Sequence, residues 1–78
     1  MKIHVRYYGM LSELVQKDTE LLNLNASHLS EVIDTLQKKY PGLIEKVYKV
    51  AVNDEIVDGD IELKDNFSMD LMPPFAGG

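Results

Sequence analysis

The chemistry that this sequence offers is concentrated in its last six residues, Pro73 to Gly78. Two prolines fix φ and favour an extended path, so the segment is predicted to leave the folded body as a stiff arm of about 20 Å. Gly77 and Gly78 lack a side chain, so they can pass through a narrow channel. Phe75 is an apolar anchor, which a frayed polar end usually lacks. We predict that a carboxylate on Gly78 is the working group.

Side chains elsewhere offer no self-sufficient active site. The chain has no cysteine, so it cannot form a thioester or persulfide of its own. It lacks the glycine patterns of phosphate-binding loops, so we expect it not to bind ATP by itself. His4 and His28 have no ligands at metal spacing, Ser12 has no base near it, and Ile56 stands where a calcium loop needs oxygen. We therefore expect no bound cofactor or metal, and we expect partners to supply the missing groups.

Composition limits the partners that this chain can have. Its 78 residues are 45% hydrophobic and 27% charged, which is typical of one small globular domain. The net charge of -5 opposes binding to phosphate backbones, so a nucleic acid partner is not expected. No segment has the apolar length of a signal peptide core or a membrane span, so we expect a cytoplasmic protein with no membrane partner.

The most regular pattern in the chain is a helix that starts near residue 28. Ser27 or His28 can cap its first turn, with Glu31 close behind, and Pro41-Gly42 ends it. Its apolar residues recur at i, i+3, i+4, i+7 and i+11 and form a stripe along one face. The members of this stripe are Leu29, Val32, Ile33, Leu36 and Tyr40.

Alternating apolar residues predict five strands around this helix. The first and last strands are expected to bury one face each, and Asn53-Asp54 is expected to form a tight turn. One helix packed on one face of a mixed sheet of about five strands is an α+β roll, which we assign to residues 1–72, followed by the arm 73–78. The strands are 2–8, 19–25, 48–52, 56–57 and 67–72, with a short helical turn at 10–15, and the expected inward residues are Ile3, Val5, Tyr7, Leu22, Leu24, Phe67, Met69 and Leu71.

A docking patch is expected where the arm begins. If the first and last strands pair, Tyr8 and Met72 are neighbours, and both are predicted to be exposed. Together with Pro73, Pro74, Phe75 and Ala76 they form the predicted partner-binding surface.

At the level of the whole chain, the sequence resembles the ubiquitin-like sulfur carriers with a β-grasp fold, most closely the small subunit of molybdopterin synthase. The residues that carry this resemblance are the ending 72–78, Tyr7-Tyr8-Gly9 with Leu14-Val15, the helix stripe, and Ala51-Val52-Asn53. The family often has a Gly-Asp turn before its last strand. Here Asn66 stands in that turn, and we expect it to take the left-handed conformation in place of the glycine.

The resemblance implies a specific reaction at Gly78. An E1-like adenylyltransferase would use ATP to adenylate this residue, and a sulfur donor protein would help convert it to a thiocarboxylate. The arm would then enter the large synthase subunit, within a heterotetramer, and give sulfur to a pyranopterin precursor. Carrying sulfur covalently divides one difficult insertion into easier steps.

Three other functions remain open from the sequence. The same fold and tail occur in sulfur carriers for thiazole synthesis and in ubiquitin-like modifiers that attach their last glycine to a lysine. Pro73-Pro74 favours the molybdopterin branch, because thiazole carriers usually lack this pair. A non-catalytic interaction module is also compatible with the fold, but it leaves the ending unexplained.

Overall fold

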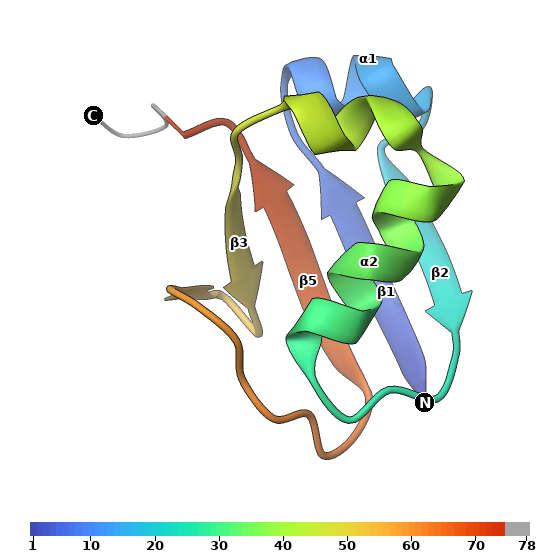
Figure 1. The fold of residues 1–78 in the computed structure, drawn as a ribbon, viewed down its shortest axis with the longest axis vertical. Coiled ribbons are helices and arrows are strands. Elements are labelled where there is room, and N and C mark those ends of the chain that lie inside the picture. Colours follow the sequence, from blue (N-terminus) through green and yellow to red (C-terminus); the bar gives the residue numbers. More distant parts are fainter. Residues whose placement is uncertain (75–78) are drawn as a thin grey trace.

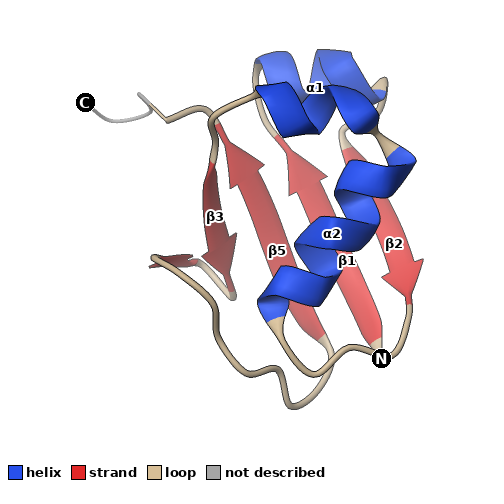
Figure 2. Ribbon diagram, in the orientation of Figure 1, coloured by secondary structure: helices blue, strands red, loops and turns tan. Residues whose placement is uncertain are grey.

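A five-stranded mixed sheet carries its longest helix on one face in the computed structural model, which describes residues 1–74 (Figure 1). The sheet order is β2-β1-β5-β3-β4, in which β1 and β5 are parallel and the other neighbours antiparallel (Figure 2). The predicted α+β class and β-grasp arrangement are confirmed. The elements are β1 (Lys2–Tyr7), α1 (Met10–Val15), β2 (Thr19–Asn23), α2 (Leu29–Lys39), the 3-10 helix η1 (Pro41–Glu45), β3 (Lys49–Val52), β4 (Glu55–Val57) and β5 (Phe67–Met72).

The two central strands build the core. β1 and β5 run in parallel register, with Ile3 opposite Phe67 and Tyr7 opposite Leu71. Side chains alternate between the two faces of a strand, so every second residue of each strand points toward α2. The predicted inward residues of both strands are buried, and removing them from water supplies the main drive for folding.

Helix α2 is fixed at both ends by hydrogen bonds. The Glu31 carboxylate accepts the Ser27 N–H at 3.1 Å, the Ser27 hydroxyl at 2.7 Å and the His28 N–H at 3.1 Å. This arrangement satisfies donors that a helix N-terminus leaves free. At the other end, the Tyr40 N–H donates to the Leu36 carbonyl at 2.7 Å before η1 begins. The predicted stripe faces the sheet, with Leu29, Val32 and Leu36 buried and Ile33 and Tyr40 partly buried.

The β3–β4 hairpin turns at the two predicted residues. Asn53 and Asp54 have φ of 49° and 69°, both left-handed, as a two-residue turn between twisted strands requires. The Asn53 N–H donates to the Ser68 carbonyl at 2.9 Å, and the Ser68 N–H donates to Asn53 Oδ1 at 3.1 Å. The turn is therefore tied to β5 as well as to its own strands.

Two details of the prediction are wrong. Asn66 does not adopt the left-handed conformation, because its φ is not positive. Its side chain acts instead, since Asn66 Oδ1 accepts the Lys2 N–H at 2.7 Å and joins the start of β5 to the start of β1. Strand β2 ends at Asn23, two residues earlier than predicted; Leu22 is buried as predicted, and Leu24, beyond the strand, is partly buried and packs against the core.

Within residues 1–74, no helix combines the length and the apolar character that crossing a membrane would require.

Candidate functional site at the root of the arm

Strand β5 sets the position from which the arm leaves. The Tyr8 N–H donates to the Leu71 carbonyl at 3.1 Å, which extends the β1–β5 ladder by one residue. On its other side, Met72 pairs with Lys49 of β3. The end of β5 is thus held from both sides, and Pro73 follows directly. Figure 1 shows that this end of the sheet lies beside α1 and η1.

The arm root is the segment where Met72 passes into Pro73, and Gly9 lies against Pro73. Gly9 has a φ of 59°, and a Cβ placed on it would lie 3.0 Å from Cγ of Pro73. The Gly9 carbonyl also accepts the Ser12 N–H at 3.1 Å and the Ser12 hydroxyl at 2.9 Å, so the same residue starts α1. A side chain at this position would force either Gly9 or Pro73 to move. The sequence alone predicted no contact between Gly9 and Pro73.

The structure brings together the described part of the predicted docking patch. Tyr8 is 43% exposed, as expected, and the pairing of β1 with β5 places it beside Met72. Met72 itself is half-buried, which corrects the prediction of an exposed side chain, and Pro73 and Pro74 are also half-buried. Phe75, Ala76, Gly77 and Gly78 lie outside the described residues, so their roles stay predictions.

Further apolar side chains are exposed in segments at this end of the molecule. Met10 begins α1, Ile44 lies in η1 and Val47 lies between η1 and β3. They are 48%, 64% and 75% exposed, respectively. Exposed apolar residues near a functional segment favour a protein interface. Sequence reasoning missed these three, because their spacing resembles that of a buried helix or strand.

An ion cluster of Arg6, Asp54 and Asp70 lies on the face of the sheet opposite α2. Arg6 Nε contacts Asp70 Oδ1 at 2.6 Å, and Arg6 Nη2 contacts Asp70 Oδ2 and Asp54 Oδ1, each at 3.1 Å. Asp70 is only 8% exposed, so its charge needs this partner. The hydrogen bond that Arg6 donates to Asp70 raises the pKa of Arg6. In the sequence, Arg6 and Asp70 alternate with the inward residues of the predicted first and last strands, but this pattern does not pair them.

A second buried carboxylate belongs to Glu20 of β2, whose side chain faces the end of α2. Its side chain is 6% exposed and accepts the hydroxyls of Tyr7 and Tyr40, each at 2.8 Å, together with the Lys39 ammonium. Burial works to raise the pKa of Glu20, but the hydrogen bonds from Lys39, Tyr40 and Tyr7 outweigh it and lower this pKa. Burial, followed by the bond to Glu20, raises the pKa of Tyr7. The cluster has a structural role, because the hydrogen bond to Glu20 holds the side chain of Tyr7, the residue before Tyr8.

Titratable groups in the described part of the chain do not form a metal site. Residues 1–74 contain no group of three or more histidine, cysteine, aspartate or glutamate side chains placed to hold an ion. His4 is exposed on β1, and His28 lies at the start of α2, where the sequence placed both.

The sequence matches the model of the ThiS family over residues 5–78. This match begins in β1 and includes both the arm root and the two glycines.

Solved structures agree with this match. The putative molybdopterin converting factor, subunit 1, from Pyrococcus furiosus is 26% identical, with a TM-score of 0.85 over 95% of this chain and 98% of that chain. A chain in the complex of subunits 1 and 2 of the molybdopterin-converting factor from Helicobacter pylori is 27% identical, with a TM-score of 0.67 over 100% of both chains. Small archaeal modifier protein 1 from Methanosarcina acetivorans, at 20% identity, a TM-score of 0.76 and coverage of 99% and 96%, shares the fold.

Proposed function

The chain belongs to the ThiS family of ubiquitin-like sulfur carriers, and we propose that its Gly78 carries sulfur as a thiocarboxylate for molybdopterin synthesis. The observation that carries this proposal is the extent of the family match, which runs to Gly78 and so includes the proposed reacting group. The molybdopterin branch is supported by the identities of 26% and 27% to chains of converting factors.

The arm root is suited to a protein that presents its last residues to partners. β5 lies between β1 and β3, so Met72 is anchored in the sheet, and Pro73 and Pro74 follow directly at the end of this strand. Gly9 leaves room for Pro73, and Pro73-Pro74 gives the departing segment a restricted path. A rigid base lowers the entropy lost when a partner positions the arm.

The chemistry follows from the weakness of a free carboxylate as an electrophile. Transfer of AMP from ATP to the Gly78 carboxylate releases pyrophosphate and gives the acyl carbon a good leaving group. Hydrosulfide delivered by a donor protein then attacks the acyl carbon and displaces AMP, which leaves a thiocarboxylate, a soft nucleophile. The chain contains no cysteine, so both the activating and the sulfur-donating groups belong to partners.

Three kinds of partner follow from this proposal. An E1-like adenylyltransferase binds the arm for activation, a sulfur donor protein supplies the sulfur, and a large synthase subunit receives the loaded arm. One structural neighbour is a complex of subunits 1 and 2 of a molybdopterin-converting factor, which supports the large subunit as a partner. A heterotetramer of two small and two large subunits is part of the proposal.

Intact-mass measurement tests the carrier function. Full-length protein is incubated with ATP, a competent activating enzyme and a sulfur donor, beside a matched protein that lacks Gly78. The expected result is replacement of one oxygen by sulfur in the full-length protein alone. No mass change in the full-length protein refutes the carrier function.

The loaded protein then tests the pathway. Incubation with the large synthase subunit and a pyranopterin precursor is expected to yield the dithiolene product and to return the carrier to its carboxylate form. If the loaded protein instead gives its sulfur to a thiazole-forming enzyme, the protein is a sulfur carrier for thiazole synthesis. Lysine-linked conjugates of the chain in cell lysate would assign it as a protein modifier.

A further inference from the structure

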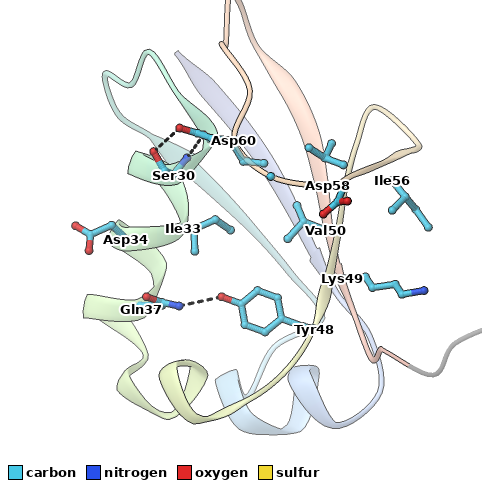
Figure 3. A pocket seen from close by; sticks show the side chains of 13 residues that line it. Ser30, Ile33, Asp34, Gln37, Tyr48, Lys49, Val50, Ile56, Asp58 and Asp60 are labelled. Carbon is cyan, nitrogen blue, oxygen red and sulfur yellow. Dashed lines mark hydrogen bonds between the residues drawn. The ribbon is translucent and has the colours of Figure 1, made fainter.

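A groove of about 720 Å³ separates α2 from the β3–β4 hairpin (Figure 3). One wall comes from the exposed flank of α2 and the other from β3, β4 and the turn that follows them. Such a volume lies in the range of sites that take a few side chains of a ligand. The side chains that decide its chemistry are Ile33, Asp34, Val50, Val57, Asp58 and Asp60.

Hydrogen bonds cross this groove toward its two ends and leave an apolar floor between them. Ser30 donates its N–H and its hydroxyl to Asp60 at 2.8 and 2.9 Å, and Gln37 Nε2 donates to the Tyr48 hydroxyl at 3.1 Å (Figure 3). Between these bridges the α2 residue Ile33 points toward the hairpin (Figure 3). The two walls are thus held at a fixed separation, and the groove is already formed.

The floor consists of partly buried aliphatic side chains on the helix side of the sheet. Val50 pairs with the inward residue Leu71 and, on its other side, with Val57, so both valines face the same way. Both pack against the core together with Ile33, but none is fully buried. An aliphatic side chain inserted here would remove this surface from water, which favours binding.

The rim of the groove is acidic. The hydrogen bonds that Asp60 accepts from Ser30 lower its pKa and so favour its carboxylate form. Asp34 makes an exposed pair with Lys38 at 3.1 Å, and such surface pairs exchange partners at little cost. The basic residue of the lining, Lys49, extends away from α2 (Figure 3). An incoming cation would therefore meet carboxylates from both walls.

We propose that this groove binds a short extended segment of a partner protein in which aliphatic side chains are flanked by lysine or arginine. The floor matches the aliphatic groups, and the carboxylates of Asp34 and Asp58 match the cations. β4 is one of the two edge strands of the sheet, so an extended segment can lie along it. A second copy of the chain fits poorly, because each copy carries a net charge of -5.

This site is independent of the arm. The groove lies on the helix side of the sheet, whereas Tyr8 follows the inward Tyr7 and points to the opposite face. The proposed segment can therefore bind while the arm occupies another protein. The inference also stands without the sulfur-carrier function, because it uses none of the residues of the arm.

Methyl and amide NMR spectra of the full-length protein test this site. The probe is the synthetic peptide acetyl-Gly-Lys-Leu-Ile-Lys-Gly-amide, and the control is the same peptide with both lysines replaced by glutamate. The expected result is saturable shifts of the Ile33, Val50 and Val57 methyl signals with the basic peptide, and binding of the acidic peptide that is about tenfold weaker or more.

Two double variants with the same change in net charge show whether peptide binding depends on the carboxylates of the groove or only on the net charge of the protein. Asp34→Asn with Asp58→Asn should weaken binding of the basic peptide about fivefold, since two cation partners are lost. Glu13→Gln with Glu45→Gln removes the same charge from exposed residues outside the groove and should leave binding within about twofold. Folding of each variant is checked by its dispersed methyl spectrum.

Several results would overturn the proposal. These are absence of saturable shifts at millimolar peptide, equal binding of the two peptides, equal effects of the two double variants, or shifts centred on Leu21 and Met72 of the opposite face. Groove shifts that depend on protein concentration without peptide would instead identify a second copy of the chain as the occupant.

Discussion

Arg6 holds both carboxylate oxygens of Asp70 across the parallel strands β1 and β5, with Nε to Oδ1 at 2.6 Å and Nη2 to Oδ2 at 3.1 Å. The two residues are directly opposite in the strand register. A two-point contact of this kind fixes the relative orientation of both side chains as well as their charges. This contact therefore stabilises the pairing of β1 with β5, the strand that leads into the arm.

Replacing Arg6 alone should lower the stability of the fold more than replacing Arg6 and Asp70 together. Arg6→Met leaves the Asp70 carboxylate, 8% exposed, without its main partner, so the melting temperature should fall by several degrees. Arg6→Met with Asp70→Asn removes the unpaired charge and should recover part of the loss. Thermal unfolding followed by circular dichroism measures both variants. A double variant less stable than Arg6→Met would contradict this account.

The strands and the main helix could be predicted because their signals are local. Ile3, Val5 and Tyr7 alternate with polar residues, and the α2 stripe repeats at helical spacing, so each pattern states which face is buried. The Asn53-Asp54 turn was predictable for the same reason, because few residues accept two consecutive left-handed conformations.

The site could be predicted only in part, because its remaining contacts join residues that are distant in the sequence. Gly9 meets Pro73, and Arg6 meets Asp70, only after β1 and β5 have paired in one particular register. Asn66 illustrates the limit, since its type fitted a left-handed turn but its side chain is used to bind the Lys2 N–H. Register and side-chain partners are tertiary information that periodicity does not contain.

Glu20 should make stability depend on acid pH. Its pKa lies below its ordinary value of 4.5, so at acid pH the unfolded chain binds this proton more readily than the folded protein does. The stabilisation is therefore complete above pH 4.5 and is lost as pH falls through the lowered value. Glu20→Gln should be less stable than the wild type at pH 7, and this difference should shrink in acid.

Chemical denaturation at a series of pH values measures this effect. Glu13→Gln, which alters an exposed carboxylate on α1, is the control and should follow the wild-type curve at every pH. If Glu20→Gln stayed less stable than the wild type by a constant amount throughout acid pH, the carboxylate charge would not be the cause.

Tyr8 should contribute to binding of the proposed large subunit. Its side chain is 43% exposed beside the arm root, so Tyr8→Asp should place a charge in the interface and weaken binding about tenfold or more, with folding retained. Leu21→Asp is the matched control. Leu21 is 57% exposed on the same face but lies opposite His4, nearer the other end of β1. Calorimetric titration giving equal losses for both variants would place the interface elsewhere.

Gly9 and Gly59 together test whether the direction of the arm matters. Both have positive φ, of 59° and 92°, so alanine at either position should lower the free energy of unfolding by about 1 kcal/mol or more through backbone strain. Only at Gly9 would the added Cβ meet the arm, 3.0 Å from Pro73 Cγ, whereas at Gly59 nothing lies within 4 Å. Gly9→Ala should therefore slow sulfur loading, and Gly59→Ala should not.

Two measurements on the same samples separate strain from arm direction. Denaturant unfolding gives the stability of each variant, and the rate of oxygen-to-sulfur exchange by intact mass gives its loading. Where the measured stabilities of the two variants are similar, a loading defect confined to Gly9→Ala is assigned to displacement of Pro73. Equal slowing in both variants would assign the defect to lost stability, and loading of Gly9→Ala at the wild-type rate would show that the activating enzyme tolerates a displaced arm root.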